Sequence, residues 1–550
     1  MEQFEFIVTL YNKEELESFY EDMETPGGNL FIPDREVFLV HRRKISRNTH
    51  YMLTFEEAQT IKVDPRVRDV EFASAAEDVQ PNGFSITGKF SKDWFSDADD
   101  INWGLLRHSE TSNRSNWGDN GSSNQTATVN FTASGKNVDV VIVDGHLDPA
   151  HPEFAANSDG SGGSRVNQFN WFSLTNSVTG GSNGTYTYTP YVDGSNANRT
   201  ADNNHGCHVA GTVAGNTQGW ARDANIYNIS PYSTNPNSLS SNLIWDYIRE
   251  WHNTKAINPA TGRRNPTITN NSYGSVITAN EGNFGPVTQV TYRGTSFSPG
   301  RSLTDAELEA RGFYVDPDED YLVIPNYFTS RISDMEDAIA DGIIIVASAG
   351  NSSWKITNPT DQDYNNSYQV TYFGFTQTYN LHRGTGSGAG LLANIVVGAT
   401  SNNVNEEKAA FSNCGNQVDI YAAGEAIQSS LHTGSLSDPR NTSYKLGKYQ
   451  GTSMSGPQVA GVLALLAEQW PGMTQEQAQK WIVDNANTDQ MADTETDDAM
   501  DRSSLQGAPN KYLRWINQRP QTGSVFPKRN FSNRPTTGNT YPRLRVRRRG

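Results

Sequence analysis

Cysteine, long apolar runs and a leader segment are all scarce or missing in this chain. Only Cys207 and Cys414 occur among 550 residues, which excludes a fold held together by a disulfide framework. No stretch approaches the roughly 18 to 20 apolar residues that span a bilayer, so we expect no membrane span. The N-terminus, MEQFEFIVTLYNKEE, lacks the basic and apolar regions of a secretory signal peptide. The localisation therefore stays open between the producing cell, a virus particle and export by another route.

Positive charge is also in short supply. The chain has 44 Lys and Arg against 61 Asp and Glu, a net charge of −17, which disfavours nonspecific nucleic-acid binding by the body of the protein. A chain of this length exceeds what one hydrophobic core usually organises. Its 47 glycines, together with many Asn, Ser and Thr, are typical of a globular enzyme core with long polar loops. We therefore expect two or more structural units.

The pattern of residues 1–85 predicts a small separate α+β unit. FEFIVTL alternates as a strand does, and KEELESFYEDM is an acidic helix candidate. A second set follows, with a strand, a helix and a final strand in HYMLTF, EEAQTIKVDP and VRDVEFA. Strand, helix, strand, strand, helix, strand is the order of a ferredoxin-like fold.

Residues 86–135 are predicted to be a polar connector that includes the start of the main unit, and the pattern changes at residue 136. Short apolar runs bounded by Gly and polar loops follow, which suits strands of a parallel sheet buried on both faces; they are VDVVIVD (138–144), GIIIVASAG (342–350), NIVVGAT (394–400) and VDIYAAG (418–424). Helical patterns alternate with them, for example NLIWDYIREWHN (242–253) and RISDMEDAIADG (331–342). For residues 136–487 this alternation predicts an α/β fold with a doubly wound, mostly parallel sheet, whose ligands bind beyond the carboxyl ends of the strands.

Polar insertions and charged stretches surround this predicted core. Gly/Ser/Asn/Thr-rich insertions occupy roughly 157–203, 275–328 and 353–390, and residues 488–550 form a C-terminal extension. The acidic clusters DPDED (316–320) and DTETDD (493–498) are either structural calcium sites or solvated loops, and no metal ligand is assigned. The basic tail PRLRVRRRG (542–550) either binds an acidic partner or is a free charged terminus.

Three segments carry a carboxylate, an imidazole and a hydroxyl in positions that suit acyl transfer. Asp144 stands at the carboxyl tip of the strand 138–143, His205 begins a helix of small residues, and Ser453 begins an apolar helix. A serine becomes a good nucleophile when a base removes its proton, and imidazole does this near neutral pH. The carboxylate holds the imidazole in the required tautomer. We predict that Ser453 is the nucleophile, His205 the base and Asp144 the residue that orients it, with no cofactor required.

The charge that develops on the attacked carbonyl oxygen needs preorganised donors. Asn351, in SAGNSS just past the strand 343–347, is positioned to offer its side-chain amide. The backbone N–H of Ser453 at a helix N-terminus is a second donor, favoured by the helix dipole. We predict that these two groups form an oxyanion hole.

These segments resemble the signatures of the subtilase family of serine proteases. GTSMSGPQVAG (451–461) resembles the family's serine signature, HGCHVAG (205–211) its histidine signature and IVDGHLDPAHPEF (142–154) its aspartate signature. The order Asp, His, Ser is that of subtilisins. ASAGN is similar to the segment with the oxyanion asparagine, and AAFSNCGNQVDIYAAG (409–424) to a further family stretch. The resemblance covers roughly 135–487 and implies a subtilisin-like fold and activity on protein or peptide substrates.

The resemblance also implies a primary specificity pocket and an inhibitory partner within the chain. NNSYG (270–274) is similar to the edge strand that pairs with an extended substrate, so two segments would form the pocket walls: Ser272, Tyr273, Gly274 and Ala347, Ser348, Ala349, Gly350. Residues 48–73 resemble the end of a subtilase propeptide. By that resemblance the unit 1–85 acts as chaperone and inhibitor until it is cleaved off, through autoprocessing, between about residues 75 and 105.

Some positions depart from the family pattern. Gly145 stands where the family usually has Ser or Thr, which either removes one hydrogen bond to Asp144, worth about 1 kcal/mol, or tilts that aspartate. Cys207 replaces a usual Thr beside His205 and is either inert and buried or a thiol-sensitive position. His208 is predicted to be structural, whereas His146 and His151 are predicted to be loop residues.

Two functions from different classes remain after this reasoning. The first is a serine endopeptidase that works through an acyl-enzyme and processes itself. The second is a subtilase fold kept as a structural or binding component of a virion or surface assembly, with weak or no activity.

Overall fold

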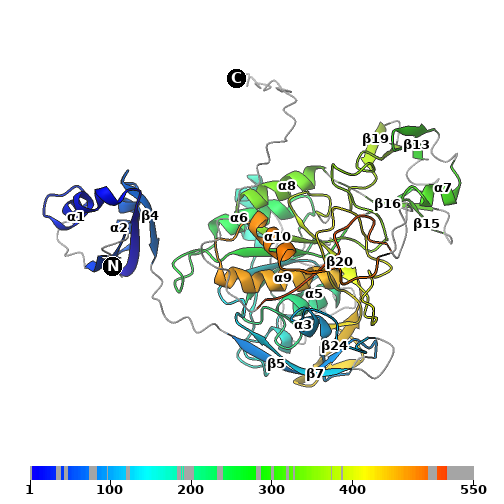
Figure 1. Ribbon diagram of the computed structural model, residues 1–550, viewed down its shortest axis with the longest axis horizontal. Coiled ribbons are helices and arrows are strands. Elements are labelled where there is room, and N and C mark those ends of the chain that lie inside the picture. Colours follow the sequence, from blue (N-terminus) through cyan, green and yellow to red (C-terminus); the bar gives the residue numbers. More distant parts are fainter. Residues whose placement is uncertain are drawn as a thin grey trace.

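The structure is a computed structural model. It describes residues 3–32, 39–42, 47–72, 83–95, 97–118, 124–181, 188, 190, 204–231, 239–274, 276–279, 287–298, 303–316, 321–325, 327, 329–372, 375–385, 388–493 and 504–516. A small N-terminal unit, blue in Figure 1, lies apart from a large body that holds most of the helices and strands.

The N-terminal unit has the predicted order of elements. These are β1 (Phe4–Leu10), the 3-10 turn η1 (Lys13–Glu15), α1 (Leu16–Glu24), β2 (Leu39–Arg42), β3 (Asn48–Leu53), α2 (Phe55–Lys62) and β4 (Val67–Phe72). The sheet order is β2-β3-β1-β4, with β1 antiparallel to both neighbours. Thr54 caps α2 through a capping box with Glu57. Val8, Phe19 and Tyr51 are fully buried in its own core, so the unit is organised as a ferredoxin-like domain.

A nine-stranded sheet forms the centre of the large body, in the order β25-β26-β21-β20-β17-β11-β8-β10-β9. The strands are β8 (Asp139–Val143), β9 (Val166–Asn167), β10 (Asn225–Ile229), β11 (Thr267–Asn271), β17 (Ile344–Ser348), β20 (Ile395–Thr400), β21 (Ile420–Ala423), β25 (Asn487–Thr488) and β26 (Lys511–Tyr512). Every neighbouring pair is parallel except β25 with β26. The predicted doubly wound, mostly parallel α/β fold is confirmed.

Helices cover both faces of this sheet because its central strands are apolar on both sides. The helices are α5 (Asn204–Ala214), α6 (Ile244–Thr254), α8 (Thr329–Ala340), α9 (Thr452–Gln469) and α10 (Gln475–Asp484). Val140 and Ile142 of β8 pack into the cluster that contains α5 and α9. Val141 and Val143 point to the opposite face and join the cluster that contains α6 and α8.

The described residues of 84–131 belong to the main body; most of them fall in the stretch 86–135, which was predicted to be a polar connector and the start of the main unit. They form β5 (Phe84–Ser91), β6 (Asp100–Asn102), α3 (Trp103–Arg107) and β7 (Gln125–Phe131). Phe90 and Trp103 are fully buried in the main core. The ammonium group of Lys92 is also buried, 2.9 Å from the Glu406 carboxylate. The C-terminal segment 504–516 joins the body as well, through β26 and the buried Trp515. The domain boundaries as such stay a prediction.

The polar insertions build their own small sheets. Those toward the upper right of Figure 1 contain β12 (Val276–Ala279), β13 (Val287–Tyr292), β14 (Thr295–Phe297), α7 (Asp305–Glu309), β15 (Tyr314–Asp316), β16 (Tyr321–Pro325), β18 (Ser367–Tyr372) and β19 (Phe375–Asn380). The other described elements are η2 (Pro152–Phe154), then η3 (Trp171–Leu174) and α4 (Thr175–Thr179) in the first insertion, and a separate three-stranded sheet of β22 (Ile427–Leu431), β23 (Leu436–Asp438) and β24 (Asn441–Tyr449).

Within the described ranges, no helix has both the length and the apolar character that crossing a membrane requires. The same residues hold no group of three or more His, Cys, Asp or Glu arranged to bind a metal ion. Most of both acidic clusters, at 317–320 and 494–498, and all of the basic tail lie outside the described residues. The calcium and acidic-partner interpretations therefore stay predictions.

Candidate active site

Asp144 begins the site at the carboxyl edge of the main sheet. It directly follows β8 and is fully buried. Its backbone N–H donates to the carbonyl oxygen of Ile229 at the end of β10, at 3.2 Å. The backbone N–H of Gly145 donates to Asp144 Oδ1 at 2.7 Å. Gly145, which stands where the family usually has Ser or Thr, therefore still donates a hydrogen bond to Asp144, from its backbone N–H.

His205, the second residue of α5, contacts Asp144 directly. Its Nδ1 lies 2.9 Å from both carboxylate oxygens. Because a carboxylate only accepts, Nδ1 carries the proton and Nε2 of the neutral ring is the free basic nitrogen. Burial, the largest influence, lowers the pKa of His205, but the charge of Asp144 and its hydrogen bond outweigh it and raise the pKa above the ordinary value. The ring is a third exposed, at 35%, so a substrate can reach it.

α5 and the loop that follows Asp144 approach each other closely, which explains why Gly206 follows His205 in the histidine signature. A Cβ atom on Gly206 would lie 2.4 Å from the carbonyl oxygen of Gly145, so a larger residue would push α5 away from Asp144. Asn228 Nδ2 donates to the same Gly145 oxygen at 3.0 Å and so helps to hold this peptide in place.

Ser453 is the second residue of α9 and is buried, with 8% exposure. Its Oγ donates to the backbone oxygen of Ser272 at 3.2 Å, and Ser272 Oγ donates back to the Ser453 oxygen at 3.2 Å. Ser272 follows β11, whose last residue Asn271 is the register partner of Val143 in β8. The ends of two adjacent strands therefore bring Ser453 next to the Asp144 segment. The hydroxyl points to Ser272 rather than to His205.

Asn351 lies three residues beyond β17 and is held by the start of α9. Its Oδ1 accepts hydrogen bonds from both the backbone N–H and the hydroxyl of Thr452, each at 2.8 Å. A Cβ atom on Gly451, whose φ is +142°, would lie 3.3 Å from Asn351 Nδ2 and 3.5 Å from the Ser453 nitrogen. Neither nitrogen donates to another group in the described part of the chain. Two N–H donors thus face one small space that the absence of a side chain at Gly451 leaves open.

Asn413 supports this arrangement, and no role for it was predicted. It is fully buried. Its Nδ2 donates to the Ala349 oxygen at 2.7 Å, and its Oδ1 accepts from the backbone of Ser352 at 3.1 Å and of Trp354 at 2.9 Å. It therefore holds the loop that carries Asn351. Its position in the stretch 409–424 was the only signal in the sequence.

The two predicted pocket walls lie at neighbouring strand ends. Asn271 and Ala347 are register partners in β11 and β17, so the segments 272–274 and 347–350 leave the sheet side by side. Ser348 Oγ donates to the Asn271 oxygen at 3.4 Å. Burial raises the pKa of the Tyr273 hydroxyl to about 12, which keeps this wall uncharged.

His208, His151 and Cys207 lie near Asp144 and His205 in the sequence and are fully buried. His208 Nε2 donates to the Ile427 oxygen at 2.7 Å, and burial lowers the pKa of His208 to about 3. His151 is fully buried, with Nε2 on the Lys445 oxygen at 2.9 Å. Cys207 is fully buried and forms no disulfide, as the inert interpretation of this residue expects.

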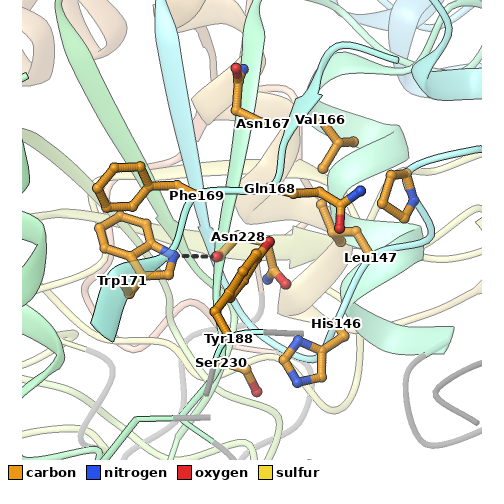
Figure 2. Close-up of a pocket in the computed structure, with 11 residues that line it drawn as sticks. His146, Leu147, Val166, Asn167, Gln168, Phe169, Trp171, Tyr188, Asn228 and Ser230 are labelled. Carbon is orange, nitrogen blue, oxygen red and sulfur yellow. Dashed lines mark hydrogen bonds between the residues drawn. The ribbon is translucent and has the colours of Figure 1, made fainter. Parts of the chain in front are cut away.

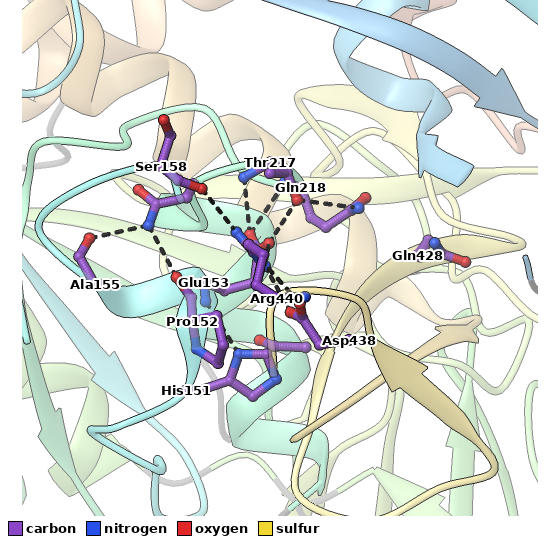
Figure 3. Close-up of polar contacts among 12 residues, drawn as sticks. His151, Pro152, Glu153, Ala155, Ser158, Thr217, Gln218, Gln428, Asp438 and Arg440 are labelled. Atoms are coloured by element: carbon purple, nitrogen blue, oxygen red, sulfur yellow. Dashed lines mark hydrogen bonds and ion pairs between the residues drawn. The ribbon is translucent and has the colours of Figure 1, made fainter. Parts of the chain in front are cut away.

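A buried ion cluster, formed by Glu153, Asp438 and Arg440, connects the segments around the site (Figure 3). The Arg440 guanidinium pairs with both carboxylates, with Nε 3.0 Å from Asp438 Oδ1. Glu153 also accepts from the backbone of Thr217 at 3.0 Å and Gln218 at 3.1 Å. The cluster thus joins the turn after Asp144, the segment after α5 and the hairpin β23–β24 that precedes Ser453. The sequence indicated no role for these charges.

Comparison with known proteins places most of the main body in one family. A family model described as the subtilase family, peptidase S8, matches residues 135–507. Subtilisin E of Bacillus subtilis (strain 168) is 29% identical over 153 residues, 28% of this chain and 31% of that protein. The alkaline serine exoprotease A of Vibrio alginolyticus is 24% identical over 304 residues, 55% of this chain and 38% of that protein. The alignments therefore span only about a third of these curated relatives.

Among solved structures, a cold adapted subtilisin-like serine proteinase aligns with a TM-score of 0.43 and 19% identity. This alignment covers 75% of the present chain and 98% of that chain.

Proposed function

Because the chain belongs to the subtilase family of serine proteases, we propose that it is a serine endopeptidase that acts through an acyl-enzyme on Ser453. The observation that carries this proposal is the direct contact between Asp144 and His205 at the sheet edge where α9 presents Ser453. A buried carboxylate on Nδ1 leaves Nε2 as the base, which is the arrangement that activates a serine.

In the proposed reaction, Ser453 Oγ leaves the Ser272 oxygen by rotation about its Cα–Cβ bond and donates to His205 Nε2. Hydrogen bonds of this kind are often loose before a substrate binds. The oxygen attacks the substrate carbonyl while Nε2 takes the proton, and Asp144 stabilises the imidazolium. His205 then gives the proton to the leaving amine. Water, activated by the same imidazole, hydrolyses the acyl-enzyme and frees Ser453.

We propose that Asn351 Nδ2 and the Ser453 N–H hold the oxygen that becomes negative. The Asn351→Ala variant should therefore lower kcat by roughly 100- to 1000-fold with little change in KM, because the interaction strengthens only in the transition state. Steady-state kinetics with a chromogenic peptide would measure this. Asn358→Ala is the matched control, since Asn358 lies in the same segment and, among the described residues, hydrogen-bonds with its near neighbours and Asn416 rather than with the site. A loss carried by KM alone would contradict the proposed role.

The direct test of the proposed function is labelling with a fluorophosphonate, which reacts with base-activated serines. We expect the folded protein to be labelled once, on the tryptic peptide that contains Ser453, and the heat-unfolded protein to remain unlabelled. Mass spectrometry of the digest would locate the adduct. A folded chain that stays unlabelled after its N-terminal unit has been removed would favour the structural role in an assembly instead.

We further propose that residues 1–85 act as an inhibitory propeptide that the enzyme removes itself. The resemblance of residues 48–73 and the separate core of this unit support the idea. Phe84, the first residue of β5, pairs with Phe131 and packs in the main core, so we expect the cut just before Phe84, slightly upstream of the boundary at residue 85.

A further inference from the structure

A buried histidine that has no part in the proposed reaction connects the two segments that carry Asp144 and His205. This residue, His432, directly follows β22 and is only 4% exposed. Its Nε2 lies 2.8 Å from the backbone oxygen of His146, and because a carbonyl oxygen only accepts, Nε2 carries a proton and donates. His146 belongs to the loop after Asp144, and it lines a small pocket together with residues of β9 and β10 (Figure 2).

The backbone around His432 is bound to the start of α5. The N–H groups of His432 and Thr433 both donate to Asn204 Oδ1, each at 2.9 Å. Asn204 Nδ2 donates in return to the Thr433 oxygen at 3.1 Å. Asn204 is the first residue of α5 and directly precedes His205. Three hydrogen bonds therefore fix this segment one residue away from the proposed base.

The strand that leads to His432 is also attached along α5. Ser429 Oγ and Ser430 Oγ of β22 donate to backbone oxygens of this helix, at 2.8 and 2.9 Å. A Cβ atom on Gly211 of the helix would lie 2.3 Å from Ser429 Oγ, so strand and helix fit closely. His432 is therefore part of one unit with α5, and its ring ties the loop after Asp144 to that unit.

The contact between Asp144 and His205 depends on how these two segments are spaced. His205 Nδ1 lies 2.9 Å from both carboxylate oxygens, and a misplacement of about 1 Å in a catalytic arrangement costs roughly 100-fold in rate. We propose that His432 is a positioning residue: by holding the His146 carbonyl it sets the distance between the Asp144 loop and α5. The proposal rests on the peptidase function proposed above, and adds a residue that touches neither substrate nor reacting atoms.

Kinetics of two variants test this role. His432→Ala should lower kcat by roughly 10- to 100-fold and leave KM within about threefold, because the predicted substrate-binding segments 272–274 and 347–350 follow other strands. His432→Gln should restore kcat to within about threefold of the wild type, since a glutamine amide places an N–H donor close to the position of Nε2. Steady-state measurements with a chromogenic peptide would give both values.

Proton NMR provides a readout that needs no catalysis. A proton between an imidazole and a carboxylate resonates far downfield, because the charged acceptor makes the hydrogen bond short and strong. The spectra are best recorded with Ser453→Ala added to every protein, which prevents self-digestion. The signal of the His205 Nδ1 proton should shift upfield or disappear in His432→Ala and remain in His432→Gln.

His252→Ala is the matched control. His252 Nε2 also donates to a backbone oxygen, that of Asp341 at 3.1 Å, and its Nδ1 lies 2.8 Å from Thr267 Oγ1. Thr267 begins β11 and Asp341 precedes β17, so this histidine lies at the sheet edge opposite to Asp144. Its loss should lower the free energy of unfolding, keep kcat within about twofold and leave the downfield signal unchanged.

Asn204→Ala removes the other half of the attachment and tests the same idea if His432→Ala does not fold. It should lower kcat by a similar factor. Because both residues act through one contact, the double variant should lose little more than the more affected single variant.

The outcomes separate this proposal from the proposed function. If His432→Ala lowers the free energy of unfolding but keeps the wild-type kcat and downfield signal, His432 only packs and this inference is overturned. A loss of kcat that His432→Gln does not restore would also overturn it, because the hydrogen bond to His146 would not be the cause. A failure of the peptidase function would instead appear as absent fluorophosphonate labelling and no cleavage of any peptide, while the NMR comparison would still report on the contact.

Discussion

The Ser453→Ala variant is expected to hydrolyse peptides about a million-fold more slowly than the wild type. Without the hydroxyl, no acyl-enzyme forms, and His205 and Asp144 have no nucleophile to activate. The expected residual rate is that of water attack helped by the oxyanion donors, roughly 1000-fold or more above the uncatalysed reaction. Steady-state kinetics with long incubations would measure the difference.

The same variant tests self-processing. It should persist as the full 60.7 kDa chain, whereas the wild type should acquire a new N-terminus at about Phe84. Adding a trace of wild-type enzyme distinguishes cleavage in cis from cleavage in trans. A Ser453→Ala chain that matures at the wild-type rate in a protease-free preparation would contradict autoprocessing.

Ser455→Ala is the control for Ser453→Ala. Ser455 lies two residues further along α9, is fully buried, and its hydroxyl donates to the Thr452 oxygen at 3.1 Å. The substitution makes the same chemical change in the same helix without touching the proposed nucleophile. Activity within about tenfold of the wild type is expected, since only a local hydrogen bond is lost.

The Arg440→Met variant is expected to lower the free energy of unfolding of the main body by about 3 to 5 kcal/mol. It removes the cation that neutralises Glu153 and Asp438, both fully buried, and leaves two carboxylates without a counter-charge. Urea unfolding followed by tryptophan fluorescence would measure the loss. The comparison is best made with Ser453→Ala added to both proteins, because self-digestion would otherwise obscure the transition.

The effect of Arg440→Met should depend on pH. Burial raises the pKa of Glu153, but the charge of Arg440 and hydrogen bonds from Thr217 outweigh this, and the pKa in the folded protein is about 2, below the ordinary value of 4.5. Because this pKa is lower in the folded protein, ionised Glu153 contributes to the free energy of unfolding above pH 4.5. This contribution is lost as the pH falls toward 2 and Glu153 is protonated. The stability difference between variant and wild type should therefore be largest near pH 7 and shrink below pH 4.5.

Arg249→Met is the matched surface control. Arg249 also pairs with two carboxylates, Asp337 and Asp341, but this pair is solvated, with Asp337 63% exposed. Its loss should cost no more than about 1 kcal/mol. Equal effects at both arginines would show that the buried cluster does not stabilise the fold in the expected way.

Local patterns in the sequence were sufficient to predict the main strands and helices of the fold. The apolar runs at 138–144 and 394–400 became central strands because a strand buried on both faces requires apolar residues at every position. Small residues after His205 indicated a helix that packs closely, and Gly206 does meet the Gly145 oxygen. By contrast, the stretch 86–135 was predicted to be a connector and the start of the main unit, and its first strand, β5, was not recognised because a strand with one buried face has apolar residues only at alternate positions.

The sequence by itself determined which groups are the candidates for the proposed chemistry. Ser453, His205, Asp144 and Asn351 each follow or begin an element with a strong local pattern, so both the residue and its place at the sheet edge were predictable. Tertiary structure alone decided what surrounds them. Arg440 and Glu153 are 287 residues apart, and a single charge in a polar loop has no local signature that reveals its partner. The same holds for the Ser453 hydroxyl on the Ser272 oxygen, because this contact joins segments whose separation in the chain carries no periodic signal.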